Sequence, residues 1–166
     1  LVSAESAAKE AQLKLLRYQL NPHFLFNTLN SIASLVGTQR SKDAQSMIAE
    51  LSTFLRFSLE SDSNITIPLR DEIEALDHYL RIEQVRFSDR LVVEQDIDPS
   101  ALAIQVPSLV LQPLVENAIK HAIGRAEEGG CIRVTARRET KSLVLSVEDS
   151  GSSEDTKDPN LADLFD

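Results

Sequence analysis

The stretch that decides the fold is residues 22–59, PHFLFNTLNSIASLVGTQRSKDAQSMIAELSTFLRFSL. Apolar residues recur in it at steps of three and four, first before Gly37 and again after Asp43, which is typical of two amphipathic helices. Gly37 is expected to end the first helix, and Ser41 or Asp43 to cap the second, which runs to about Leu59. Two long helices joined by a short turn predict an antiparallel hairpin.

The first helical pattern extends upstream, so that residues 3–36 are expected to form one long helix. Pro22 lies inside it and removes one backbone hydrogen bond, so we expect the helix to bend just before this proline. The apolar stripes of residues 1–62 are too wide for a lone hairpin. A second copy would complete a four-helix bundle across a two-fold axis, and packing on the rest of the chain is the alternative. We expect a homodimer.

The remaining residues, 63–166, predict a second domain with alternating helices and strands. Expected are strands at 65–67, 91–97, 131–138 and 142–148, a helix at 71–87, and a helix that Pro107 opens and that runs to about residue 123. This order indicates an α+β fold, in which helices cover one face of a mixed sheet.

Charge and composition exclude several classes of protein. The chain has 166 residues and a net charge of −9, and all of the acidic excess lies beyond residue 62. A nucleic-acid-binding surface needs a basic stripe, so no nucleic-acid partner is expected. No apolar run approaches the length of a membrane span. The single cysteine excludes an intramolecular disulfide, and no His, Cys or acidic pair has the spacing of a zinc site.

His23 is the first candidate for chemistry. Asn27 follows it by one helical turn on the same face, and an amide there can hold one ring nitrogen while the other stays free. A neutral imidazole is a good nucleophile near neutral pH, and this arrangement suits phosphorylation on histidine. On spacing alone, an inert histidine at the helix border is the simpler interpretation.

The segment 109–123, LVLQPLVENAIKHAI, is the second candidate. On a helix, Glu116, Asn117, Lys120 and His121 share one edge. An amide and a carboxylate can hold a hydrated Mg²⁺ ion, and a lysine one turn later can meet phosphate oxygens. A surface edge with an ion pair between Glu116 and Lys120 explains the same spacing equally well.

The complete strings are more specific than the spacings. Residues 16–30, LRYQLNPHFLFNTLN, closely resemble the phosphoacceptor box of LytS-type sensor histidine kinases. The resemblance implies that His23 is phosphorylated and that Asn27 orients it. Many other histidine kinases carry an acidic general base directly after the histidine, where this chain has Phe24. No general base is therefore assigned.

Residues 109–123 resemble the N-box of the GHKL (Bergerat-type) ATPases. The resemblance implies ATP and Mg²⁺ as cofactors, with Asn117 as a metal ligand and Glu116 acting through metal-bound water. Lys120 and His121 would face the phosphates. Residues 79–83 and 86–91 resemble the helix and turn that precede the N-box in the same kinases, and we expect a structural role for them.

The segment 147–151, VEDSG, resembles the first glycine box of the same superfamily. The resemblance implies that Asp149 reads adenine and that Gly151 lets the backbone approach the base. Ser153 stands where that box normally has a second glycine, and no glycine follows Gly151 in the chain. The lid and the second glycine-rich box of the ATP-binding domain are therefore missing from this pattern.

Together the resemblances imply the catalytic core of a sensor histidine kinase in a two-component system. His23 would take a phosphoryl group from ATP and pass it to an aspartate in a response-regulator receiver domain. We expect a cytoplasmic location, with the membrane reached only through a sensor region outside this chain. One alternative is an ATP-independent phosphotransfer or scaffold protein. Another is a GHKL-type ATPase with Glu116 as base, which leaves His23 unexplained.

Overall fold

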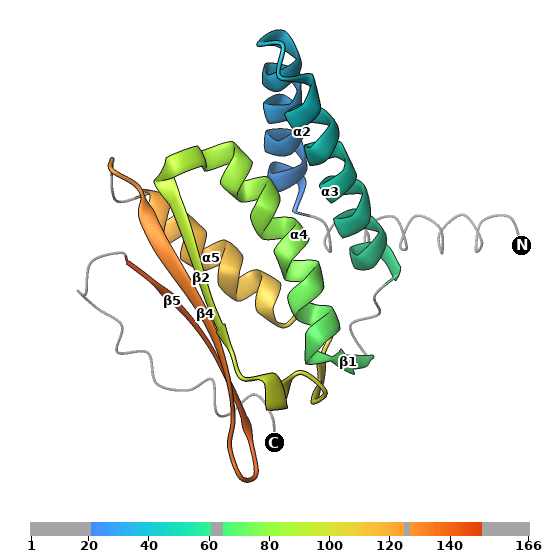
Figure 1. Cartoon of the computed structure of the whole chain (residues 1–166), viewed down its shortest axis with the longest axis vertical. Coiled ribbons are helices and arrows are strands. Elements are labelled where there is room, and N and C mark those ends of the chain that lie inside the picture. The colour runs from blue at the N-terminus through green and yellow to red at the C-terminus, as the bar shows by residue number, and fades with distance from the viewer. Residues whose placement is uncertain (1–20, 61–64, 125–126, 151–166) are drawn as a thin grey trace, which may run out of the picture.

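A helical hairpin stands on an α+β layer in the computed structural model, which describes residues 21–60, 65–124 and 127–150 (Figure 1). The hairpin consists of α2 (Pro22–Gly37) and α3 (Ser41–Glu60), which run antiparallel as predicted. The expected boundary between residues 62 and 63 lies outside the described residues. No helix in the described part of the chain is both long and apolar enough to cross a membrane.

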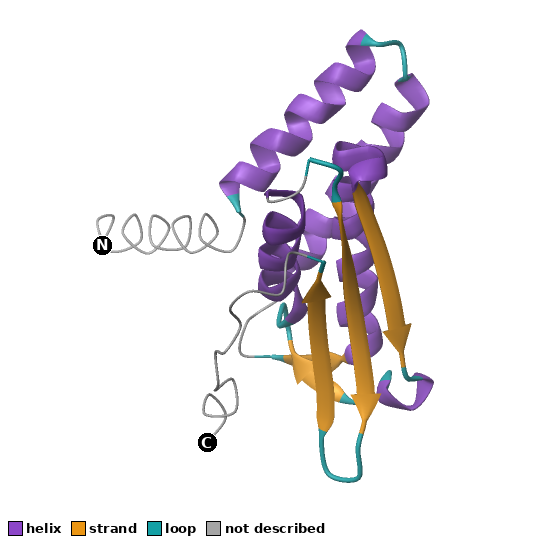
Figure 2. Ribbon diagram, turned by 90° about the vertical axis from the view of Figure 1, so that its left-hand side faces the viewer, coloured by secondary structure: helices purple, strands orange, loops and turns teal. Residues whose placement is uncertain are grey.

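The α+β layer follows the hairpin along the chain. Its elements are β1 (Thr66–Pro68), α4 (Leu69–Phe87), the 3-10 turn η1 (Ser88–Arg90), β2 (Leu91–Ile97), the 3-10 turn η2 (Pro99–Ala101), β3 (Gln105–Pro107), α5 (Leu111–Gly124), β4 (Gly130–Arg138) and β5 (Leu143–Asp149). The main sheet has the order β2-β4-β5, with β2 parallel and β5 antiparallel to β4. Helices α4 and α5 lie on one face of it, so the predicted mixed sheet with one covered face is confirmed (Figure 2).

The main sheet has one apolar and one charged face. In β4, Ile132, Val134 and Ala136 are fully buried and belong to the same hydrophobic core as the inner residues of α4 and α5. The residues between them point the other way, and Arg133 and Arg137 form ion pairs there with side chains of β2. The alternation follows from the two-residue period of a strand.

The expected start of α5 at Pro107 is wrong. Pro107 is the last residue of β3, which pairs with β1 so that Thr66 lies opposite Pro107, and the helix begins at Leu111. Between the two elements the chain turns at Leu109, whose φ is 61°. A three-residue strand is too short to show a two-residue period in the sequence, and a proline is as acceptable at a strand end as in a first helical turn.

Glu72 of α4 holds the beginning of α5 in place. Its carboxylate is buried and accepts hydrogen bonds from the backbone N–H of Leu109 (2.9 Å) and of Leu111 (3.0 Å). A carboxylate at a helix N-terminus satisfies otherwise unpaired donors and is favoured by the helix dipole. Burial raises the pKa of Glu72, and the backbone N–H groups oppose that shift.

Three aromatic rings pack together between the hairpin and α4. Phe24 of α2, Phe54 of α3 and Tyr79 of α4 are buried, with ring centroids 4.9–5.6 Å apart. A polar contact accompanies them, in which Nδ1 of His78 lies 2.5 Å from a carboxylate oxygen of Glu50. Edge-on and tilted ring pairs at such distances contribute beyond the burial of their area. The orientation of α2 relative to α4 is therefore set by packing.

Candidate functional site

Helix α2 begins at Pro22, and His23 lies in its first turn. Asn21 is its N-cap, and Oδ1 of Asn21 accepts hydrogen bonds from the backbone N–H of His23 (3.1 Å) and of Phe24 (3.3 Å). A proline in the first turn costs no helical hydrogen bond, since the N–H it lacks would have no partner. Pro22 thus lies at the start of α2, and the bend expected just before it would involve residues outside the described ones. Residues 3–20 of the expected long helix lie outside them.

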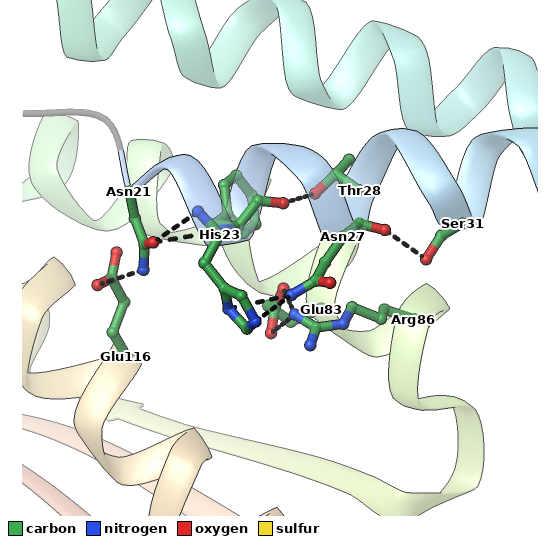
Figure 3. Close-up of polar contacts among 9 residues, drawn as sticks. Asn21, His23, Asn27, Thr28, Ser31, Glu83, Arg86 and Glu116 are labelled. Atoms are coloured by element: carbon green, nitrogen blue, oxygen red, sulfur yellow. Dashed lines mark hydrogen bonds and ion pairs between the residues drawn. The ribbon is translucent and has the colours of Figure 1, made fainter. Parts of the chain in front are cut away.

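The His23 imidazole is exposed and lies against the amide of Asn27, as the spacing predicts (Figure 3). Nδ2 of Asn27 is 3.1 Å from Nδ1 and 3.2 Å from Nε2 of the ring. In this position the amide nitrogen of Asn27 donates a hydrogen bond to a ring nitrogen of His23. That bond occupies the lone pair with which the ring would attack as a nucleophile. Turning the amide by 180° presents Oδ1 to the ring N–H and leaves the other ring nitrogen free to react.

Phe24 explains why no acidic residue follows the histidine. Its side chain is 4% exposed and belongs to the aromatic group with Phe54 and Tyr79, so a carboxylate at this position would be buried in the core. Burying an unpaired charge there would be costly. Since Phe24 points into the core, the neighbouring His23 is turned towards the open side of α2.

His23 faces a cleft of about 700 Å³ between α2, α4 and α5. Each helix supplies polar side chains to it: His23 comes from α2, Glu83 and Arg86 from α4, and Asn117 and Lys120 from α5. The two groups of residues identified separately in the sequence, around His23 and around Asn117, therefore line one cleft of a single chain. Its volume is within the range of small-molecule sites.

Glu116 connects the two sides of this cleft. Its Oε1 accepts a hydrogen bond from Nε2 of Gln112 (2.9 Å), and its Oε2 accepts one from Nδ2 of Asn21 (3.4 Å). Figure 3 shows Glu116 on α5 facing the start of α2. An ion pair between Glu116 and Lys120, which the spacing allowed as an alternative, is not among these contacts. Asn117 and Lys120 are exposed, so their polar atoms are accessible to a ligand.

His121 and Asp149 lie together outside the cleft lining. Nδ1 of His121 is 3.9 Å from Oδ2 of Asp149, which is the last residue of β5. The next residue, Ser150, joins the end of β5 to β4, because its Oγ accepts a hydrogen bond from the N–H of Cys131 (2.8 Å). Gly151 lies outside the described residues. Asp149 is thus held at the end of a strand, beside His121 of α5.

Glu83 and Arg86 are site residues that the sequence interpretation missed. Glu83 is 2% exposed, and its carboxylate oxygens lie 3.2 and 3.4 Å from Nη1 of Arg86. Burial raises the pKa of Glu83, and Arg86 opposes that shift. The three-residue spacing of the pair on one helix was the available signal. That the pair faces His23 depends on how α2 packs, which the spacing does not reveal.

The described residues also bear on metal binding. No group of three or more His, Cys, Asp or Glu residues among them is arranged to hold a metal ion. The described residues therefore offer no complete set of protein ligands for a metal ion. Mg²⁺ commonly uses one or two protein oxygens and completes its shell with water and substrate phosphates. The carboxylate of Glu116 and the amide oxygen of Asn117 fit that requirement.

The chain is similar to known proteins over most of its length. The family model described as histidine kinase matches residues 11–91, which include α2, α3 and α4. The sensor protein LytS of Staphylococcus haemolyticus is 40% identical over 157 residues, which is 94% of this chain. The chain belongs to the LytS-type family of sensor histidine kinases.

Two further relatives are named sensor histidine kinases. The sensor histidine kinase BtsS of Escherichia coli K12 is 42% identical over 85% of this chain, and the sensor histidine kinase YesM of Bacillus subtilis is 36% identical over 90% of it. The chain covers 25–27% of the length of these proteins and of LytS. It thus spans about a quarter of a LytS-type sensor.

Proposed function

We propose that this chain is the catalytic core of a LytS-type sensor histidine kinase, which transfers the γ-phosphoryl group of ATP to His23. One observation carries the proposal: the exposed imidazole of His23 and the polar edge of α5, with Asn117 and Lys120, line the same cleft. A phosphoryl donor bound to α5 would be held beside its acceptor. Holding two reactants in place is a large part of catalysis in phosphoryl transfer.

Mg-ATP is the proposed substrate complex. Asn117 would ligate Mg²⁺, Glu116 would act through metal-bound water, and Lys120 would meet phosphate oxygens as a point charge. Asp149 would bind the adenine amine, with Gly151 beside the base and His121 near the phosphates. When bound, Mg²⁺ neutralises charge on the phosphates. The accessibility of Asn117 and Lys120 supports these assignments.

The step at His23 needs an unprotonated ring nitrogen directed into the cleft. That nitrogen forms a bond to the γ-phosphorus, the bond from phosphorus to the bridging oxygen breaks, and ADP leaves with the electron pair. The proton on the other ring nitrogen is then released. Asn27 would orient the ring by accepting this N–H through Oδ1, since the amide is within 3.2 Å of both ring nitrogens.

The partners of the proposed kinase follow from the same family. A receiver domain of a response regulator would take the phosphoryl group from His23 onto an aspartate. A second copy of the chain would cover an apolar face of the hairpin, where several large side chains are about half exposed or more. These are Phe26, Leu29 and Val36 of α2 and Ile48 and Leu59 of α3. We place this core on the cytoplasmic side of a membrane-anchored sensor.

Radiolabelled ATP tests the proposal. The native chain is expected to take up label that is stable in base and lost in acid, as a phosphohistidine is, and His23→Gln to take up none. His78→Gln is the matched control, because His78 lies outside the cleft, and it should be labelled like the native chain. Label that survives in His23→Gln, or that is stable in acid, would contradict the assignment.

The alternative of an ATP-independent phosphotransfer or scaffold protein has one observation in its favour, which is Ser153 in place of a glycine. Calorimetry separates the two. Binding of Mg-ATP that Asn117→Ala weakens supports the kinase. Absence of binding to the native chain would support the scaffold.

A further inference from the structure

The cleft contains one cationic side chain for which the proposed function has no role. Lys120 extends from α5, the helix to which ATP is assigned, whereas Arg86 extends from α4. The Arg86 side chain is 23% exposed, and its guanidinium carbon lies 4.5 Å from the centre of the Phe87 ring. A guanidinium that is half withdrawn from water loses much of its hydration and needs other partners.

Glu83 satisfies only part of this requirement. Both of its carboxylate oxygens bind the same nitrogen of Arg86, Nη1. Within the described chain, Nε and Nη2 of Arg86 make no hydrogen bond, although a guanidinium carries five N–H donors. The pair therefore holds the guanidinium at one end and leaves donors at the other end for an anion.

The position of the pair indicates which anion. Figure 3 shows Glu83 and Arg86 on the same side of α2 as the His23 ring and the Asn27 amide. All but Asn27 line the cleft that also contains Lys120. Lys120 of α5 and Arg86 of α4 thus bring cations to this cleft from two different helices. An anion at this place would meet cations from two directions.

We propose that Arg86 is a further catalytic residue, whose free N–H groups bind the phosphoryl group as it passes to His23, and that Glu83 is its positioning residue. The inference rests on the proposed function. During transfer the charge is spread over three phosphoryl oxygens, and a planar guanidinium can bind two of them at once. The bonds made and broken are those already given, and Arg86 exchanges no proton.

A purely structural role fits less well. A buried ion pair adds little stability compared with apolar residues of the same volume, because both charges must be taken out of water. An ion pair that served only packing would also be more stable if two guanidinium nitrogens each bound one carboxylate oxygen, as is common between these groups. Here one nitrogen takes both bonds, and the others are left over beside the acceptor histidine.

The first test measures autophosphorylation at saturating Mg-ATP. Arg86→Ala is expected to slow labelling of His23 by about 100-fold or more, within the range seen when one donor to a developing charge is removed. Affinity for Mg-ADP, which lacks the transferred group, should stay within about threefold of the native value. Arg70→Ala is the matched control on the same helix and should label at the native rate. Labelling of Arg86→Ala within threefold of native would overturn the proposal.

Two further measurements separate catalysis from folding. Guanidinium ion at a few tens of millimolar should restore part of the activity of Arg86→Ala and leave Arg70→Ala unchanged. If thermal unfolding shows that Arg86→Ala does not fold, Arg86→Lys provides the test. Lysine keeps the charge but lacks the paired N–H donors of a guanidinium, so this variant should fold and label His23 at least about tenfold more slowly than the native chain. A native rate in Arg86→Lys would overturn the proposal.

The role of Glu83 is tested by a double-mutant cycle. Glu83→Gln should slow labelling less than Arg86→Ala does, and the double variant should be no slower than Arg86→Ala alone, because Glu83 acts through Arg86. Independent, multiplied effects would contradict the positioning role, since a merely structural defect would add to the loss of the guanidinium.

Phosphoramidate distinguishes failure of this inference from failure of the proposed function. It is a small phosphoryl donor that does not need the nucleotide site. If the native chain is labelled by phosphoramidate but not by ATP, the kinase assignment fails, and Arg86 can still be assessed. Arg86→Ala should then slow labelling from phosphoramidate, and Asn117→Ala should not. Equal labelling of Arg86→Ala and native chain by this donor would overturn the role of Arg86.

Discussion

Asn21 and Glu116 join α2, the helix that carries His23, to α5, the helix that carries Asn117, through a hydrogen bond of 3.4 Å from Nδ2 to Oε2. The oxygen of the same amide caps α2, because it accepts from the backbone N–H of His23 and Phe24. One side chain therefore fixes where α2 begins and how close its first turn lies to α5.

Separating these two tasks of Asn21 gives a first prediction. Asn21→Ser keeps a capping oxygen but is too short to reach Glu116, so the free energy of unfolding should change by less than about 0.5 kcal/mol. Labelling of His23 should slow by about tenfold, because the two helices are less well aligned. Asn21→Ala also loses the cap, at a cost of about 1 kcal/mol. Urea unfolding and initial labelling rates provide the measurements.

Asn30→Ser is the control for this series, since it makes the same change on the exposed side of the same helix. It should leave both quantities at their native values. A native labelling rate in Asn21→Ser would mean that the contact with Glu116 has no part in alignment.

Glu72 is predicted to determine the stability of α5. Glu72→Ala leaves the backbone N–H groups of Leu109 and Leu111 without their acceptor, which should lower the free energy of unfolding by about 3 kcal/mol. Glu72→Gln keeps one acceptor oxygen and should lose about half as much. Glu74→Ala, an exposed acid on the same helix, should have little effect in the same urea titration. Equal stability of Glu72→Ala and Glu74→Ala would contradict the capping role.

The pH dependence of stability should carry the signature of two buried carboxyl groups. Burial raises the pKa of Glu72 and of Glu83 above the ordinary glutamate value of 4.5. At pH values above 4.5 the folded chain therefore keeps protons that the unfolded chain has released. The contribution of these groups is complete below pH 4.5 and is lost as the pH rises through their folded-state pKa values.

Urea unfolding at a series of pH values from 4 upwards checks this contribution. The slope should be shallower in Glu83→Gln than in the native chain, because glutamine does not titrate. Glu74→Gln changes an exposed carboxylate on the same helix as Glu83 and serves as the control. A slope that is unchanged in Glu83→Gln would show that its carboxyl titrates alike in both states.

The apolar face of the hairpin should control self-association. Phe26 is 68% exposed and Val36 is 58% exposed, and both lie on the side of α2 away from the core. Phe26→Asp should weaken a dimer by at least about tenfold, since a charge in an apolar interface must be dehydrated. Sedimentation at several concentrations measures the effect. Val144→Asp on the exposed sheet face is the control, and a native chain that stays monomeric at high concentration would contradict the dimer.

Long periodic elements could be predicted from the sequence, whereas short elements and cross-chain contacts could not. Helix α3 and strand β2 lie within a residue of their expected bounds, because each shows its period over several turns or alternations. Strand β3 has three residues and shows no period, so Pro107 was assigned to the following helix.

The candidate site was predictable to a similar degree. The proximity of Asn27 to His23 follows from helix geometry alone, and the shared edge of Glu116, Asn117 and Lys120 follows in the same way. That the two groups line one cleft depends on Phe24, which packs against aromatic residues far along the chain. Tertiary packing of this kind leaves no local pattern. The role of Arg86 was missed for the same reason.

The parallel pairing of β2 with β4 has a consequence for how the chain is made. Since α5 belongs to the crossover between these strands, the sheet cannot close until the segment with Glu116 and Asn117 has been synthesised and placed. The hairpin of α2 and α3 depends on neighbouring residues and can form as soon as it leaves the ribosome. Loops this long close slowly compared with local helices. We therefore expect the hairpin that carries His23 to fold first and to keep its apolar surface uncovered until α5 and the main sheet have formed.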